Sequence, residues 1–351
     1  MADGAEPLWV LLGDRHGDNR QLLAIADALG RPYRPVQLRF GPGARLPLAR
    51  WFAQRFTWRT DPPLSPPWPQ AVLAAGRKSV PAALWIRRAS GGQTRLVHVN
   101  RPWAPLAWFD LVVTTPQYAL PERDNVLVNL LPFVPPLAPT PLPASFAARA
   151  AALPRPWTVV LVGGNSRPFV LDEAAAAELA ATVNAERHRV GGSVWVLDSP
   201  RTPAAALAAL ERGLEAPAQI VRWGRDENCY QALLGLADAF IVTADSASML
   251  TEALLSGRPV TPFALPAMAD WRWRLVAVWR EAAERSPQSA TRRALDQLVD
   301  LGLVSSVRDL GRLQRALADA GLFGGAARPL ALAESERART VARINAVIDR
   351  S

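Results

Sequence analysis

The stretch Ala239–Pro262, AFIVTADSASMLTEALLSGRPVTP, carries the clearest fold signal in the chain. It starts with an apolar run, Ala239–Thr243, that predicts a buried strand. The polar residues Asp245–Ser248 follow and open a helix that runs through Leu255. A second strand is predicted at Val260–Pro262. A strand, a short loop, a helix and another strand in this order form the repeating unit of a parallel sheet.

The same alternation extends over most of the chain. Short apolar runs bounded by glycine or turn residues are typical of buried parallel strands. The sequence therefore predicts an α/β fold with two doubly wound parallel-sheet domains that face a cleft. The expected strands are Leu8–Leu12, Arg34–Leu38, Ala71–Ala74, Arg95–Val99, Leu111–Val113, Val126–Val128, Trp157–Val162, Ser193–Leu197, Gln219–Val221, Ala239–Thr243 and Val260–Pro262. The expected helices are Gln21–Leu29, Lys78–Arg88, Asp172–Arg187, Pro203–Arg212, Tyr230–Leu236, Ser248–Leu255 and Leu330–Asp349.

The length of 351 residues is too great for one hydrophobic core, because single cores stop growing at about 250–300 residues. A proline-dense segment near the middle of the chain is expected to be stiff and without regular structure. We therefore predict an N-terminal domain over 1–135, a linker over 136–156, a C-terminal domain over 157–330 and a C-terminal helix over 331–351.

The composition excludes several classes of protein. Hydrophobic residues make up 50% of the chain and charged residues 20%, which excludes an intrinsically disordered protein. Cys229 is the single cysteine, and His16, His98 and His188 lie far apart, so no disulfide framework and no metal site are expected. No apolar run is long enough to span a membrane, and the first residues are acidic, so we expect a cytoplasmic protein.

The basic residues are concentrated in one half of the chain. Residues 1–150 carry 17 basic and 9 acidic residues, whereas residues 151–351 carry 23 and 22. This asymmetry suits a domain that faces an anionic membrane or acceptor. The alternative is arginine-rich drift in a GC-rich genome, because Lys78 is the only lysine. No nucleic-acid partner is expected.

The loop before the helix in the opening stretch is a candidate anion site. Ser246 and Ser248 lie at a helix N-terminus, where hydroxyls, free N–H groups and the helix dipole together suit a diphosphate. Glu252 lies one turn beyond Ser248 on the same face and could accept hydrogen bonds from a ribose. The alternative is that Asp245 and Ser246 only cap the helix.

A second candidate segment is Gly163-Gly164-Asn165-Ser166-Arg167, which follows the strand at Trp157–Val162. Two glycines let the backbone approach a ligand closely, and Arg167 could neutralise a phosphate. The alternative is a tight turn between strand and helix.

A third candidate segment, Gly13–Asn19, places Asp14, His16 and Asp18 within five positions after the first strand. This loop could hold a general base that deprotonates an acceptor hydroxyl. Alternatively, Asp18 caps the helix and Asp14 pairs with an arginine. Gly76–Ser79 lacks the glycine spacing of a phosphate-binding P-loop.

Together these segments resemble the Elongated Mitochondria family of mitochondrial fission proteins, whose bacterial members are described as candidate glycosyltransferases. The sequence departs from the family at Pro116-Gln117-Tyr118, where "P-x-H-D" is usual, and at Asn228-Cys229-Tyr230, where "N-P-Y" is usual. The matching stretches are Gly13–Leu22 ("G-D…G…N-Q"), Ala75–Ala82, Phe109–Val113 ("F-D-L-V-V"), Leu161–Ser166 ("G-G") and Thr243–Ala253 ("T-x-D-S-x-S-M-x-x-E-A").

The resemblance implies a GT-B-like protein with two Rossmann-like domains, the N-terminal one on the acceptor side and the C-terminal one on the nucleotide-sugar side. It implies a metal-independent reaction without a cofactor, in which a nucleotide-diphosphate sugar is the substrate. Asp18 is favoured over Asp14 and His16 as the general base. The donor-binding residues implied by the likeness and the loops together are Gly163, Gly164, Asn165, Ser166, Arg167, Asp245, Ser246, Ser248 and Glu252.

The leading hypothesis is a glycosyltransferase that moves a sugar to a glycan or glycolipid acceptor of the cell envelope. A nucleotide-sugar epimerase is an alternative, because such enzymes share the fold. A non-catalytic adaptor is the other, because plant relatives are associated with mitochondrial fission.

Overall fold

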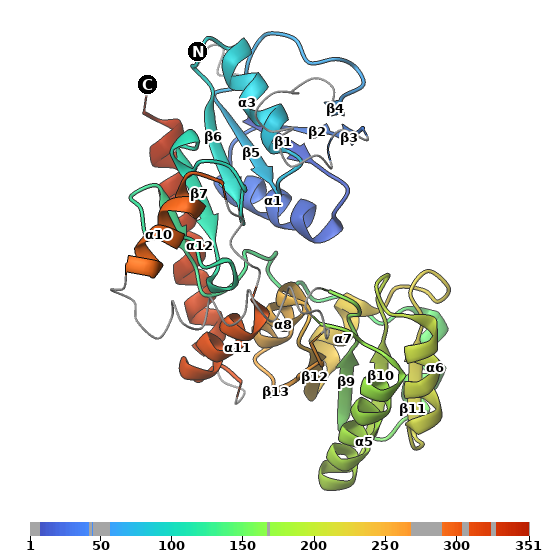
Figure 1. Ribbon diagram of the computed structural model, residues 1–351. Helices are drawn as coiled ribbons and strands as arrows, with labels where there is room; N and C mark the ends of the chain where they lie inside the picture. Colours follow the sequence, from blue (N-terminus) through green and yellow to red (C-terminus); the bar gives the residue numbers. More distant parts are fainter. Residues whose placement is uncertain are drawn as a thin grey trace. The chain divides into compact units, whose positions relative to one another are not determined.

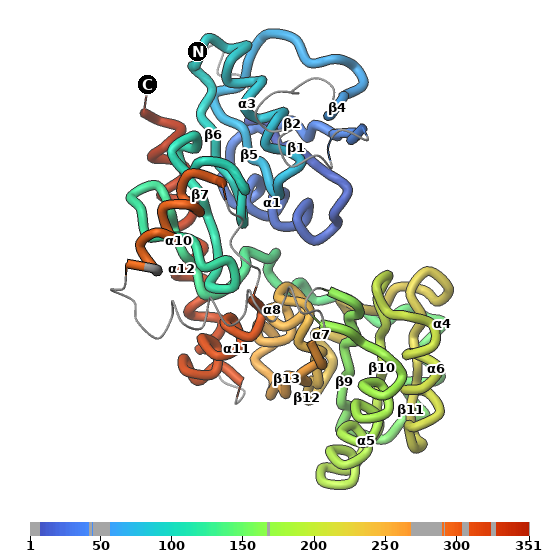
Figure 2. The backbone as a smooth tube through the Cα atoms, viewed as in Figure 1, coloured from blue at the N-terminus to red at the C-terminus, as the bar shows by residue number. Residues whose placement is uncertain are grey.

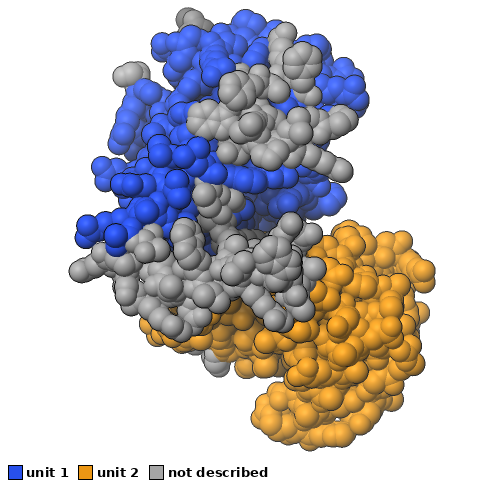
Figure 3. All heavy atoms as spheres, viewed as in Figure 1, with its two compact units in different colours: residues 1–135, 282–308, 334–351 blue, residues 136–281, 309–333 orange. Residues whose placement is uncertain are grey.

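The structure is a computed structural model. The chain forms two compact units (Figure 3). Unit 1 comprises residues 1–135, 282–308 and 334–351, and unit 2 comprises residues 136–281 and 309–333. The residues that the structure describes are 8–41, 44, 57–166, 169–267, 290–303, 309–323 and 328–350.

Unit 1 is built on a six-stranded sheet in the order β2-β1-β5-β6-β7-β8 (Figure 1). Every pairing within it is parallel. The order reverses at β1, which has β2 on one side and β5 on the other, so this edge is the topological switch point of the sheet. The strands are β1 (Leu8–Leu12), β2 (Tyr33–Gln37), β5 (Ala71–Ala75), β6 (Arg95–Val99), β7 (Leu111–Thr114) and β8 (Val126–Val128).

Helices cover both faces of the unit 1 sheet, as the alternating pattern predicts. On one face, α1 (His16–Leu29) packs with residues of α12 (Arg328–Ile348), including the fully buried Ile344. On the other face, α3 (Val80–Ala89) packs into a second apolar cluster that also takes in part of α10 (Ala290–Asp300). Figure 2 shows that helices from late in the chain lie against the sheet formed by early strands.

Unit 2 contains a five-stranded parallel sheet in the order β11-β10-β9-β12-β13. The order reverses between β9 and β12, which is the second switch point in the molecule. The strands are β9 (Trp157–Leu161), β10 (Ser193–Leu197), β11 (Ala218–Val221), β12 (Ala239–Thr243) and β13 (Val260–Phe263). The helices are α4 (Ala144–Ala152), α5 (Glu173–Val190), α6 (Ala204–Gly213), α7 (Tyr230–Leu236), α8 (Ala247–Leu255) and α11 (Leu310–Asp319).

The predicted fold class is confirmed, because two doubly wound parallel sheets are present and most strands lie within a residue of their expected positions. The proline-dense segment was predicted to lack regular structure, and this prediction is wrong. It contains α4, because Phe146 is buried against Trp195 with ring centroids 5.9 Å apart. In addition, residues 282–308, expected in the C-terminal domain, belong to unit 1.

Two further features were not predicted. Helix α1 begins at His16 rather than near Gln21, so Asp18 lies in its first turn and not in a loop. A short antiparallel pair joins β3 (Arg39–Phe40) to β4 (Trp58–Arg59), beside a segment that the sequence left unassigned. In the part of the chain that the structure describes, no helix is long and apolar enough to cross a membrane.

Candidate functional site

The unit 2 switch point brings together two of the three predicted segments. Gly163 and Gly164 follow β9, and Asp245 and Ser246 follow β12, which pairs with β9. The backbone N–H of Gly163 donates to Thr243 Oγ1 at 2.7 Å, and that of Gly164 donates to Asp245 Oδ2 at 3.1 Å. The carboxyl ends of the two strands are thus tied to each other at the position where open α/β sheets bind ligands.

Helix α8 starts at this edge with the serines that the sequence singled out. Ser246 is the N-cap residue, and its hydroxyl accepts a hydrogen bond from the N–H of Met249 at 3.5 Å. The capping interpretation is therefore confirmed for Ser246, although the bond is long. Both Ser246 and Ser248 are half-buried. Whether they bind a diphosphate stays a prediction.

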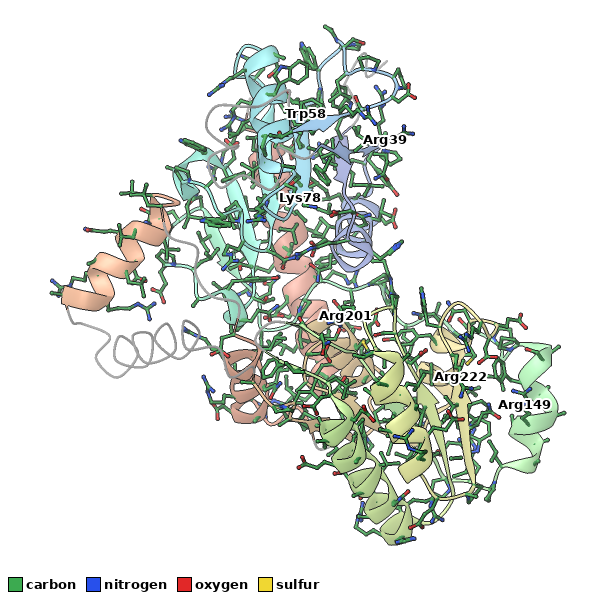
Figure 4. All side chains as sticks on the ribbon, turned by 45° about the vertical axis from the view of Figure 1, so that its right-hand side comes forward. Arg39, Trp58, Lys78, Arg149, Arg201 and Arg222 are labelled. Carbon is green, nitrogen blue, oxygen red and sulfur yellow. The ribbon has the colours of Figure 1, made fainter. Side chains whose placement is uncertain are left out.

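Asp245 has a different position from the one that a cap would take. Its side chain is fully buried, Oδ1 accepts from the hydroxyl of Thr243 at 2.8 Å, and Oδ2 lies 2.6 Å from Nη1 of Arg201. Figure 4 labels Arg201, which lies after β10. Because its side chain is fully buried and both carboxylate oxygens have protein partners, Asp245 ties the loops of the site together.

The two glycines are required by the packing of the protein itself. A Cβ added to Gly163 would lie under 3.0 Å from the carboxylate of Asp245, and one added to Gly164 would lie under 3.0 Å from the backbone of Arg201. Both glycines are buried. Packing within the protein therefore accounts for both glycines, and close approach to a ligand is not needed to explain them. The tight turn between strand and helix is not present, because β9 ends at Leu161 and α5 begins only at Glu173.

The other residues of the Gly163–Arg167 segment form local contacts or lie outside the residues that the structure describes. The Oδ1 of Asn165 accepts a hydrogen bond from the N–H of Leu171 at 2.9 Å, which closes the turn before α5. Ser166 and Phe169 exchange backbone hydrogen bonds. Arg167, the predicted phosphate partner, lies outside the described residues.

Glu252 is 6% exposed and accepts a hydrogen bond from the hydroxyl of Tyr230, the first residue of α7. Tyr230 was predicted as the start of a helix but not as a partner of Glu252, because no local signal links residues 22 positions apart. The neighbouring Cys229 is buried, and burial raises the pKa of its thiol to about 11. Cys229 is thus protonated at neutral pH and suits the role of an apolar filler.

The third predicted segment lies at the switch point of unit 1. Asp18 Oδ1 accepts from Asn100 Nδ2 at 3.2 Å, and the same amide nitrogen lies 3.2 Å from the oxygen of Gln21. Asn100 follows β6, and its φ of +68° aims it back towards α1. Asp18 is therefore oriented by a buried amide rather than capping the helix, since the N-cap residue is Arg15.

Asp14 forms an ion pair with Lys78, whose Nζ lies 2.5 Å from Oδ2. Partial burial raises the pKa of Asp14, but the hydrogen bond and charge of Lys78 outweigh it, and the net pKa is lowered. The alternative predicted an arginine as the partner of Asp14, and this is wrong, because the partner is Lys78. His16 is exposed and begins α1. Among the described residues, no three His, Cys, Asp or Glu side chains form a metal-binding group.

Two Rossmann-like units, each with candidate site loops at the carboxyl edge of its sheet, define a GT-B-like α/β protein. Spinosyn forosaminyltransferase SpnP has a similar fold, with a TM-score of 0.51 and 13% identity over 98% of this chain and 100% of that one. The chain belongs to the family described as "Mitochondrial fission ELM1", whose sequence profile matches residues 16–281.

Two curated proteins are similar to this chain in sequence. The mitochondrial fission protein ELM1 of Arabidopsis thaliana is 28% identical over 262 residues, which cover 66% of this chain and 58% of that protein. The uncharacterized protein RP120 of Rickettsia prowazekii (strain Madrid E) is 23% identical over 303 residues, which cover 74% and 83% respectively. This chain thus matches little more than half the length of the plant protein.

Proposed function

We propose that the protein is a metal-independent glycosyltransferase that moves a sugar from a nucleotide-diphosphate donor to a glycan or glycolipid acceptor. One observation carries the proposal: α8 begins at the unit 2 switch point with the half-buried serines Ser246 and Ser248. A helix start of this kind offers N–H groups, hydroxyls and the positive end of a dipole to a diphosphate.

The donor would be held by groups on one helix. The hydroxyls of Ser246 and Ser248 would donate to the diphosphate. Ser246 can do so while its oxygen still accepts from the N–H of Met249, because a hydroxyl both donates and accepts. Glu252, fixed by Tyr230, would accept from the ribose. As the sugar leaves, negative charge grows on the diphosphate, and the prearranged donors of α8 stabilise that charge without a metal.

The acceptor hydroxyl would lose its proton to a carboxylate of unit 1. Asp18 suits this role better than Asp14 for two reasons. Asn100 fixes the orientation of Asp18. The lowered pKa of Asp14 makes it a weaker base, since a base works best with a pKa near the working pH. The excess of basic residues in 1–150 would face an anionic acceptor or membrane surface.

Nucleotide-induced thermal stabilisation tests the donor site. Wild type, Ser246→Ala and Glu252→Ala would be compared with UDP, GDP, CDP, ADP, dTDP and CMP in the presence of a chelator. A nucleotide at 100 times its dissociation constant adds about 2.7 kcal/mol to the unfolding free energy. We expect one nucleoside diphosphate to stabilise wild type and to lose at least tenfold in affinity with either variant.

Ser256→Ala is the matched control, because Ser256 caps the opposite end of α8 and donates only to the carbonyl of Ala253. It should leave nucleotide binding unchanged. Equal losses in all three variants would mean a damaged helix rather than a binding site. If no nucleotide binds wild type, the donor-site proposal fails and the adaptor hypothesis replaces it. Conversion of the donor sugar without acceptor would identify an epimerase.

A further inference from the structure

The single lysine of the chain has an unusual position. All other basic residues, 39 of 40, are arginine, and Lys78 lies between β5 and α3 at the unit 1 switch point. Figure 4 labels Lys78 on this unit. Lysine and arginine are not interchangeable, because an ammonium is a compact charge with freely rotating donors whereas a guanidinium is a planar fork. This position is therefore the one where the chain uses the chemistry of an amine.

The surroundings hold the ammonium in place but leave its partner open to solvent. Nζ lies 5.2 Å from the ring centroid of Phe40 and 2.5 Å from Oδ2 of Asp14. The Lys78 side chain is 30% exposed and the Asp14 side chain is 55% exposed. The carboxylate can therefore move away from the amine without disturbing a packed core, whereas the aliphatic stem of Lys78 stays against the protein.

The two loops and the first residues of α1 carry more basic than acidic residues. The carboxylates are Asp14 and Asp18, and the basic residues are Lys78 and the exposed Arg15, Arg20 and Arg77. The guanidinium of Arg77 lies over the ring of Trp103, 5.1 Å from its centroid. Both helices that start here lack a side-chain cap: the N-cap residues are Arg15 for α1 and Ser79 for α3. The positive ends of two helix dipoles thus add to the cations at neighbouring strand ends.

We propose that this edge of unit 1 binds a phosphate group, with Lys78 as its main contact, and that Asp14 occupies the place of a phosphate oxygen while the site is empty. The observation that carries this inference is a solvent-facing carboxylate held by the only lysine at a net positive switch point. The inference rests on the proposed function in one respect, namely that the phosphate would be carried by the sugar acceptor.

The presence of a single lysine makes a direct test possible. Reductive methylation with [13C]formaldehyde labels only Lys78 and the α-amino group, and a methylated lysine keeps its charge. Lys78→Arg lacks one of the two NMR signals, which assigns the Lys78 signal. Inorganic phosphate would then be titrated at constant ionic strength, with chloride as the control anion. We expect a saturable shift of the Lys78 signal with phosphate and none with chloride.

Asp14→Asn makes the test more specific. The proposal predicts that this variant binds phosphate more tightly, whereas a damaged site would bind phosphate more weakly. If Asp14 competes with phosphate, removing its charge should tighten phosphate binding about tenfold, equivalent to about 1.4 kcal/mol. A Lys78 signal that phosphate does not move, or that moves equally with chloride, overturns the proposal. Weaker phosphate binding in Asp14→Asn also overturns it, since Asp14 would then belong to the site and not compete with it.

Two further arms identify the source of the phosphate. Glucose 1-phosphate represents a soluble sugar phosphate, and vesicles of phosphatidylcholine with phosphatidic acid represent a lipid phosphate. Pure phosphatidylcholine vesicles are the control. Loss of the Lys78 signal on the acidic vesicles alone indicates a lipid carrier, and a shift with the soluble phosphate alone indicates a soluble one.

This result is separable from the nucleotide experiment, because Lys78 belongs to unit 1 and Ser246 to unit 2. Nucleotide binding with an unresponsive Lys78 would remove this inference and leave the proposed function. A responsive Lys78 without nucleotide binding would remove the proposed donor site and leave the phosphate site.

Discussion

The switch points of the two units have the same local sequence pattern but differ in how deeply their residues are buried. In each unit the first strand runs into a glycine-containing loop that leads towards a helix. In unit 2 the Gly163–Gly164 loop is buried against the carboxylate of Asp245 and the backbone of Arg201. In unit 1 the loop after β1 leads into α1, whose second residue, Gly17, is exposed, and nothing lies within 4 Å of a Cβ added there. Glycine therefore has a packing role at the unit 2 switch point and little at Gly17.

The ion pairs at the two edges differ in the same sense. Arg201 pairs with Asp245, whose side chain is fully buried, whereas Lys78 pairs with Asp14, whose side chain is 55% exposed. A buried carboxylate depends on its partners, while an exposed one is solvated without them. The unit 2 edge is therefore built for rigidity, and the unit 1 edge is free to exchange an internal anion for an external one.

The largest expected effect comes from adding a methyl group to one glycine at each switch point. Gly163→Ala should destabilise the protein by about 3 kcal/mol, because a buried carboxylate with three partners must move. Gly17→Ala should stabilise it by about 0.5 kcal/mol, because alanine is the better helix former and the space is open. Urea denaturation of both variants measures the difference. Equal changes in unfolding free energy would contradict the difference in packing between the two switch points.

A smaller difference is expected between the ion pairs. Arg201→Ala leaves the buried Asp245 without its cation and should cost about 2 kcal/mol. Asp14→Asn removes an exposed pair and should cost less than about 1 kcal/mol. Urea denaturation at pH 7 compares the two. Similar losses would show that the unit 1 pair contributes more than its exposure suggests.

The smallest effect is a pH dependence. Because the pKa of Asp14 is lowered in the folded protein, the pair with Lys78 stabilises the fold above the usual Asp value of 3.8. That contribution is lost as the pH falls through the lowered pKa. Wild type should thus be more stable than Asp14→Asn at pH 7, and their melting temperatures should converge below pH 3.8. A difference that persists in acid would exclude the ion pair as its cause.

Much of the fold could be predicted because its strands are buried on both faces. Continuous apolar runs such as Ser193–Leu197 and Ala239–Thr243 became strands at the expected residues. Local signals failed where tertiary contacts dominate. Helix α4 forms in a proline-dense segment because Phe146 packs on Trp195, and α1 begins early because Asn19 and Asp18 are held by Gly13 and Asn100.

The candidate site shows the same limit. The serines of α8 and the acids of the first loop could be identified from local patterns, because caps and loops after strands have sequence signatures. Arg201, Tyr230 and Asn100 could not, since each is distant in sequence from the residue it positions. Lys78 stood out in the sequence as the only lysine, but this observation was used only to support arginine-rich drift as an alternative.

The sequence by itself determined the two parallel sheets, because the order of apolar runs and turns permits few other topologies. It also determined which loops lie at the carboxyl edges of those sheets. Only the tertiary structure decided that Asp245 is buried behind its loop, that Asp14 is held by Lys78, and that residues 334–351 complete unit 1. The physical reason is that burial and ion pairing depend on which distant segments meet, and local patterns do not record those contacts.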